Sequence, residues 1–327
     1  MLALALPLFL LAASLYGPAP ISLHDAWRIL SAPGAANAED GSEIYQRIIW
    51  SLRMPRALLA AVAGAGLALA GTVLQSLTRN PLADPWVLGI SSGAGVGAVL
   101  VLVLGLGGGL LSVSGGAFIG AAGAFALVLL LAGRSLNAES SLFILAGVAV
   151  TQLLSALTSL ITLWQADANA TRGVMFWLLG SFSDARWSQV GLCALLLAAA
   201  LAVCWMKAGE LDALAFGGLT AASLGVAVAP LKLLLYGITM ALTAVIVAFS
   251  GAVGFIGLTV PHVARLLVGP RHRLLLPASA LCGALFAVAA DTLARTLFEP
   301  RELPVGVLTA LLGVPVFLAL LYRKINA

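Results

Sequence analysis

The sequence predicts an all-α polytopic membrane protein with about ten transmembrane helices. The chain is 61% hydrophobic and only 9% charged, whereas about 25% of an ordinary globular domain is charged. Short strings of Pro, Gly and polar residues interrupt the apolar stretches at 79–85 (RNPLADP), 254–265 (GFIGLTVPHVAR) and 302–306 (ELPVG). Irregular backbone survives in lipid only where protein or a water-filled path satisfies it. These breaks therefore indicate a substrate route and not a passive anchor.

Charge-free stretches locate the spans in chain order, since a spanning helix needs roughly 20 apolar residues. The stretch 85–133 is long enough for two helices, which we expect to divide near the glycines at 105–109. The stretch from 233 holds one helix to about 250 and a second, Gly-broken segment at 254–268, so the predicted spans number ten, all in one domain, 1–327. The stretches are 1–23, 57–78, 85–133, 140–166, 188–206, 233–261, 274–290 and 303–322.

The N-terminal stretch resembles a signal peptide in length. It has no Lys or Arg before its apolar run, whereas signal peptides begin with a positively charged region. We therefore expect Met1–Gly17 to form the first spanning helix, followed by a periplasmic segment at 18–53.

Charge alone does not orient the chain. With the N-terminus in the cytoplasm, nine of the 17 basic residues fall inside and eight outside, which is no positive-inside asymmetry. All three lysines, Lys207, Lys232 and Lys324, fall inside in this orientation, which favours it.

Five segments between about residue 50 and the C-terminus carry a shared pattern: RMPRALLAAVAGAGLALAGTVLQSLTRNPLADPWVLGISSGAG (53–95), FWLLGSF (176–182), LDALAFGGLTAASLGV (211–226), GAVGFIGLTVPHVAR (251–265) and ELPVGVLTALLGVPVF (302–317). Together they resemble the FecCD-type permease family of ABC importers for iron complexes and vitamin B12.

The resemblance implies a homodimeric permease in a bacterial inner membrane, with an axial translocation path. It also implies two cytoplasmic ATPase subunits, which use ATP and Mg²⁺, and a periplasmic substrate-binding protein. The sequence contains no G-x-x-x-x-G-K-[ST] phosphate-binding loop, so ATP hydrolysis is expected from another polypeptide. We expect no cofactor bound by this chain and no enzymatic activity of its own.

Arg53 and Arg56 flank Pro55 at the predicted outer entrance to the second span. By themselves they are typical of basic side chains that reach lipid headgroups. The resemblance implies that these two arginines and Arg295 receive acidic side chains of the binding protein, a pairing that guanidinium groups suit. Asp291 and Arg295 lie four residues apart on a helix and can pair locally, so a structural role for them is an equal alternative.

Residues 208–228 are too polar to span and too apolar for a solvated linker. One interpretation is an interfacial helix on lipid. The resemblance implies a cytoplasmic coupling segment that contacts the ATPase, with contacts expected at Leu214, Ala221, Ala222, Leu224 and Gly225.

Two turns are candidates for the cytoplasmic gate that the resemblance implies. Asn80, Pro81 and Leu82 lie between spans two and three, where Pro81 cannot continue a helix; the alternative is an ordinary helix-ending turn with Asn as a cap. The second turn comprises Glu139, Ser140 and Ser141, whose match to the family is weaker.

Other patterns carry no chemistry. Cys193, Cys204 and Cys282 lack the spacing of a disulfide framework or a zinc site, so they are interpreted as packing residues and no metal site is expected. His262 is interpreted as structural and not as a haem ligand, and His24 and His272 as loop residues without a defined role. The G-x-S-x-G at 89–93 lies in an apolar helical span without the strand-to-helix turn of a hydrolase, and 17 basic residues spread along the chain make no nucleic-acid footprint.

These observations predict the membrane subunit of a binding-protein-dependent importer of a large iron complex, haem or a ferric siderophore. Cobalamin is the alternative substrate. An ion-coupled secondary transporter would need intramembrane carboxylates, and Asp291 is the only candidate, so this class is the least favoured. The sequence does not distinguish haem from siderophore or cobalamin.

Overall fold

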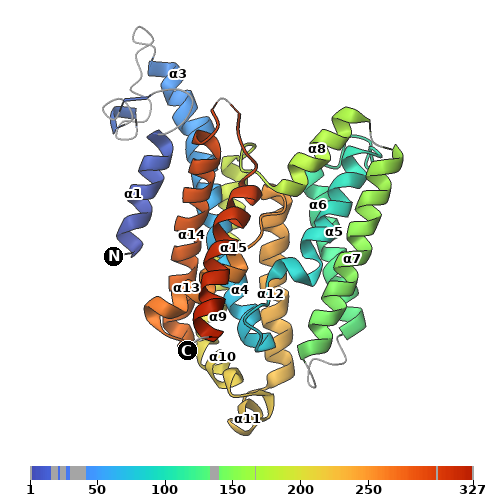
Figure 1. Ribbon diagram of the computed structural model, residues 1–327, viewed down its shortest axis with the longest axis vertical. Helices are drawn as coiled ribbons and strands as arrows, with labels where there is room; N and C mark the ends of the chain where they lie inside the picture. Colours follow the sequence, from blue (N-terminus) through green and yellow to red (C-terminus); the bar gives the residue numbers. More distant parts are fainter. Residues whose placement is uncertain are drawn as a thin grey trace.

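The computed structural model describes residues 2–15, 21–22, 27–29, 42–132, 140–165, 167–299 and 301–325, and within these ranges the regular structure is entirely helical. In Figure 1, α4, α12 and α14 lie centrally, α1 lies on one side, and α5, α6 and α7 lie on the other. α10 and α11 form one end of the molecule, and α3 and α8 lie towards the opposite end. The elements are α1 (Leu2–Leu15), α3 (Ser42–Arg47), the π-helix η2 (Ile48–Arg53), α4 (Met54–Thr78), the 3₁₀ turn η3 (Pro85–Leu88), α5 (Ile90–Leu102), α6 (Val113–Ala132), α7 (Ser140–Gln165), α8 (Ala168–Leu179), α9 (Trp187–Met206), α10 (Ala208–Ala215), α11 (Gly218–Ser223), α12 (Val228–Ser250), α13 (Ile256–Val268), α14 (His272–Thr296) and α15 (Val305–Ile325).

The predicted all-α membrane fold is confirmed. Six of the described helices are long and apolar enough to cross a bilayer, and three shorter apolar helices lie in α5, α13 and α15. The six long helices, the three shorter ones and the apolar α1 together make ten apolar helices among the described residues, in the predicted order. The division of 85–133 also falls where it was expected, because α5 ends at Leu102 and α6 begins at Val113, on either side of the glycines.

The second span begins much earlier than position 57. A continuous helical run covers Glu43–Thr78, 36 residues, and 89% of its most apolar window is buried inside the protein. The charge-free stretch begins after Arg53 and Arg56, so the sequence pattern places the start of the second span there. Both arginines are buried in the fold instead.

α4 is the central helix and packs most extensively against α14. Gly64 and Gly283 make this approach possible, since a Cβ at either position would collide with the carbonyl oxygen of the other. Small residues at such contacts bring membrane helices together.

The short helix α13 is held to α4 by polar side chains. The Gln75 amide donates to the carbonyl oxygens of Gly257 and Leu258, each at 3.2 Å, and its oxygen accepts from Arg265 at 2.8 Å. These bonds satisfy backbone carbonyls in the broken segment that begins α13, as irregular backbone in lipid requires.

Candidate functional site: a convergence of helix breaks between two polar ends

Three segments that are far apart in the sequence stop being helical at the same place. The Val305 N–H donates to the Gly180 carbonyl at 3.0 Å, and the Ser181 N–H donates to the Ser250 carbonyl at 2.8 Å. The ends of α8 and α12 therefore meet the start of α15. Gly180 and Gly251 have φ values of 76° and 66°, a conformation that favours glycine, so each helix ends where its glycine stands.

A cavity of about 350 Å³ opens beside this convergence. Aromatic side chains of Phe176, Trp177 and Phe249 line it together with polar groups. The polar residues of the lining are Ser114, Ser181, Ser183, Asp184, Gln189, Ser250 and Glu302. A second space of about 340 Å³ adjoins the same breaks and is lined mainly by apolar residues of α8, of α15 and of the loop before α13. The breaks thus separate a polar cavity from an apolar one.

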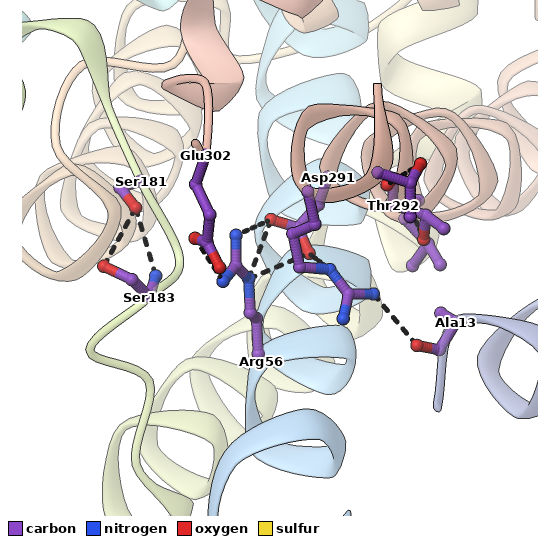
Figure 2. A network of polar contacts seen from close by, with 10 residues as sticks. Ala13, Arg56, Ser181, Ser183, Asp291, Thr292 and Glu302 are labelled. Atoms are coloured by element: carbon purple, nitrogen blue, oxygen red, sulfur yellow. Dashed lines mark hydrogen bonds and ion pairs between the residues drawn. The ribbon is translucent and has the colours of Figure 1, made fainter. Parts of the chain in front are cut away.

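A buried ion-pair network borders the polar cavity (Figure 2). The Arg56 Nε donates to both carboxylate oxygens of Asp291 at 3.0 and 3.1 Å, and its Nη1 donates to Glu302 Oε2 at 2.8 Å. Arg56 of α4 thereby joins α14 to the loop before α15. The Glu302 side chain remains 42% exposed, whereas that of Asp291 is 2% exposed, so the network reaches the cavity through Glu302.

Arg295 and Arg53 tie α1 to the same region. Arg295 Nη2 donates to the Ala13 carbonyl at 2.9 Å, and its Nε lies 3.3 Å from Asp291 Oδ2. Arg53 Nη1 donates to the Leu15 carbonyl at 2.9 Å. The local pairing of Asp291 with Arg295 is confirmed.

Arg53, Arg56 and Arg295, which are predicted to dock a binding protein, are buried in this chain. Their exposed fractions are 5%, 8% and 4%, because their guanidinium groups bond to groups of this chain. Their part in docking remains a prediction, and it requires these buried groups to become accessible. No signal local to RMPR indicates the burial, since the partners Asp291 and Glu302 lie 235 and 246 residues away.

At the opposite end, the predicted coupling segment forms α10 and α11 (Figure 1). Ala222, Leu224 and Gly225 are exposed, as contact residues should be. Leu214 and Ala221 are 2% and 0% exposed and pack into the core, so their contact with a partner stays a prediction that requires them to become accessible. Phe216 and Leu219, which sequence reasoning missed, are 76% and 91% exposed.

A hydrogen-bonded relay anchors α10 to the helices above it. The His272 Nδ1 and N–H lie 2.5 and 3.0 Å from Asp212 Oδ1, and His272 Nε2 lies 2.6 Å from the Ser76 hydroxyl. The three residues belong to α10, α14 and α4. His272 is 4% exposed and begins α14, so its interpretation as a loop residue without a role is wrong.

The turn after α4 is held by hydrogen bonds among its own residues. The Asn80 side-chain oxygen accepts from the Leu82 N–H at 2.9 Å, and its carbonyl accepts from the Ala83 N–H at 3.1 Å. These bonds match the alternative of a helix-ending Asx turn, and Pro81 and Leu82 are exposed. Glu139 lies outside the described residues, as do the side chains of Ser140 and Ser141, which begin α7. Gating stays a prediction for all six.

Asp84 follows this turn outside the spans and caps η3. Its Oδ1 accepts from the Trp86 N–H at 3.1 Å. Burial raises the pKa of Asp84 to about 6, and the Trp86 hydrogen bond partly opposes the rise.

The described residues hold no cluster of three His, Cys, Asp or Glu side chains that fits a metal ion. His262 Nδ1 lies 2.9 Å from the Leu258 carbonyl, and its ring meets Phe317 edge-on at 6.0 Å. Both contacts are those of a packed helix residue.

The sequence profile of the FecCD transport family matches residues 4–323. The chain belongs to the FecCD transport family. The sequence segments that resemble FecCD permeases contain the helix breaks around the cavity, the turn after α4, and α10 with α11. The chain is accordingly a multi-span permease subunit of the ABC-transporter type.

Two FecCD relatives differ in the substrates that their names state. The cobalamin import system permease of Halobacterium salinarum is 43% identical over 310 residues, which cover 92% of this chain and 81% of the relative. The hemin transport system permease of Yersinia pestis is 42% identical over 281 residues, which cover 84% of each chain.

A solved structure of an ABC transporter supports the fold. It is described as an inward-facing metal-chelate type ABC transporter, and it superposes with a TM-score of 0.86 at 33% identity, over 98% of this chain and 97% of the other.

Proposed function

We propose that this chain is the transmembrane permease of an ATP-driven, binding-protein-dependent importer of large iron complexes, haem or a ferric siderophore. The observation that carries the proposal is the convergence of three helix breaks around a cavity in a chain of the FecCD family. Backbone that leaves the helix within an apolar layer is the feature expected of a solute path.

Cobalamin is the second candidate substrate. The chain is 43% identical to a cobalamin permease and 42% identical to a hemin permease. The sequence identities therefore support cobalamin as well as they support haem. The aromatic and hydroxyl lining of the cavity suits either large, partly apolar solute.

The assembled importer contains two copies of this chain, two ATPase subunits and a soluble receptor, in a bacterial inner membrane. α10 and α11 face the cytoplasm, and Phe216, Leu219, Ala222, Leu224 and Gly225 form the surface that meets the ATPase. The cavity then opens towards the periplasm and the receptor. The chain holds no phosphate-binding loop, so ATP and Mg²⁺ act on the partner, and the chain itself catalyses no reaction.

Uptake by the reconstituted complex distinguishes this proposal from ion-coupled transport. We expect vanadate to stop uptake and ionophores that collapse proton and Na⁺ gradients to leave it unchanged. Uptake that resists vanadate but stops with the ionophores would assign the chain to the secondary transporters.

The ligand carried by the soluble receptor identifies the substrate. If haem is the cargo, the purified receptor should show a haem-like absorption spectrum. A corrinoid spectrum would instead identify cobalamin as the substrate and contradict the assignment of an iron complex.

A further inference from the structure

Two exposed arginines lie where α14 begins, apart from the cavities and from the surface that the proposed function gives to the ATPase. Arg271 immediately precedes α14, and Arg273 belongs to its first turn. Both side chains are exposed, and neither guanidinium group forms a hydrogen bond or ion pair within the described part of the chain. These two cations are therefore available to an anion from outside the protein.

A proline in α14 determines what surrounds Arg273. Pro277 has no N–H, so the carbonyl of Arg273, four residues earlier, lacks the donor that a regular helix supplies. The Trp205 Nε1–H donates to that carbonyl instead, at 3.1 Å. Because Trp205 lies in the last turn of α9, this bond joins the ends of two spans.

The indole ring of Trp205 also supports the guanidinium group of Arg273. The Arg273 Cζ lies 5.3 Å from the centroid of the ring, which is within cation–π range. A guanidinium group that stacks on an aromatic face keeps its N–H groups for a carboxylate or phosphate. Arg273 is therefore positioned before any ligand arrives.

The two acids of α10, which packs against α14, are bound to other groups. Asp212 accepts from the His272 N–H at 3.0 Å, and Glu210 pairs with Lys207 at 2.8 Å. The positive charge of the two arginines is therefore not cancelled by an ion pair with α10.

The residues beside the arginines are typical of a membrane interface. Trp205 and Met206 end one apolar span, and α14 begins another. Trp205, Met206 and Leu274 are 47%, 69% and 58% exposed. Tryptophan at the end of a span lies at the level of the lipid headgroups, so an anion that reaches these arginines can be part of a lipid.

We propose that Arg271, Arg273 and Trp205 form a binding site for the phosphate group of an anionic phospholipid. Guanidinium groups pair with phosphate through parallel hydrogen bonds, and basic residues next to spans attract anionic headgroups. Met206 and Leu274 supply apolar contacts for the glycerol and the first carbons of the acyl chains. The site goes beyond the proposed function and requires only that α9 and α14 span a membrane.

The test measures lipid binding to the purified full chain in neutral detergent by native mass spectrometry, with phosphatidylglycerol and phosphatidylcholine as probes. We expect wild type to retain phosphatidylglycerol preferentially. Arg271→Gln with Arg273→Gln should bind it about thirtyfold more weakly, which corresponds to roughly 1 kcal/mol for each of two basic residues at the membrane surface. Phosphatidylcholine binding should change little.

Two further double variants serve as controls. Arg172→Gln with Arg301→Gln removes two exposed charges outside this site and should bind phosphatidylglycerol like wild type. Arg271→Lys with Arg273→Lys keeps both charges and should retain most of the preference. A loss confined to the Gln variant at the site then reports its charge and not misfolding.

Trp205→Leu distinguishes a built site from a loose pair of charges. It removes the aromatic face and the indole donor, and should lower the preference for phosphatidylglycerol about two- to fivefold, the range of an exposed cation–π contact. If Trp205 were only structural, the variant would lose thermal stability while the ratio of the two lipids stayed that of wild type.

Three results would overturn the proposal. One is equal binding of phosphatidylglycerol by wild type and by Arg271→Gln with Arg273→Gln. Another is an equal loss in the control Arg172→Gln with Arg301→Gln, which would reduce the effect to net charge. The third is loss of the bound lipid to inorganic phosphate at matched ionic strength, which would assign the arginines to a soluble anion.

Discussion

At the scale of single residues, the buried carboxylate of Asp291 connects groups from two helices. It accepts from Arg56 of α4 and lies beside Arg295 of its own helix. A carboxylate paired in this way is occupied and is not an open proton or Na⁺ site. This argues against the secondary-transporter alternative, for which Asp291 was the only candidate.

Removing this carboxylate should destabilise the fold strongly. Asp291→Ala leaves the buried Arg56 and Arg295 cations without their shared partner, and breaking a buried pair costs about 3–5 kcal/mol. Chemical unfolding in detergent measures the loss, with Thr292→Val on the same helix as the control. Equal stability of the two variants would mean that the network contributes nothing to the fold.

Asp84 predicts a pH dependence of stability. Burial raises its pKa from 3.8 to about 6, so the folded state binds the proton more tightly than the unfolded state. The contribution of Asp84 to the free energy of unfolding is then fully present below about pH 4 and is lost as the pH rises to about 6 and above, by up to about 3 kcal/mol, at about 1.4 kcal/mol for each pKa unit.

Asp84→Asn keeps the oxygen that accepts from the Trp86 N–H but removes the charge. We expect it to be more stable than wild type at pH 7, with the difference shrinking towards pH 4. Unfolding midpoints across this range test it, with the exposed Asp184→Asn as control. A wild type that gains stability over Asp84→Asn as the pH rises would refute the expectation.

Residue-scale features were the hardest to predict from the sequence. The apolar pattern predicted where charges interrupt spans, but it could not show that Arg53, Arg56 and Arg295 are internal. Their partners come from distant helices, and the same limit hid the roles of His272 and Asp212. The burial of Leu214 and Ala221 could not be predicted, because a six- to eight-residue helix has too few turns to indicate its buried face.

At the scale of elements, the hydrogen bonds among Asp212, His272 and Ser76 link α10 to α14 and α4. Any displacement of α10 by a partner therefore acts directly on the helix that ends at the turn 79–82. This arrangement predicts that the relay transmits movement from the ATPase to the path.

Asp212→Ala should lower the number of solute molecules imported per ATP by about 5–10-fold, on the order of 1 kcal/mol in coupling, while basal ATP hydrolysis continues. The control is Glu210→Ala on the same helix, which breaks only the surface pair with Lys207 at 2.8 Å. Asp212→Glu should restore coupling in part. If Asp212→Ala and Glu210→Ala couple equally well, the relay is only structural.

Most elements could be predicted, because eight apolar stretches, long enough for ten spans and interrupted by Gly and Pro, carry a strong signal. α8 was missed because its 12 residues are too short for a span. Its position becomes clear only in the fold, where the Gly180 carbonyl after α8 accepts from the Val305 N–H at the start of α15. The early start of the second span was missed because η2 and α3 extend α4 through charged residues.

At the scale of the whole molecule, the polar cavity and the ion-pair network lie at one end, and α10 and α11 lie at the other. We expect the proposed solute path to run between these two ends and to open at the helix breaks. The described part of the chain supplies the path and its attachments but no source of energy.

Solute movement by the purified chain alone in proteoliposomes tests this account most directly. Accumulation of the cargo is expected only when the ATPase, ATP and the loaded soluble receptor are all present, and omission of any one should reduce it to the level of protein-free vesicles. Net accumulation by the permease without ATPase and receptor would contradict the account.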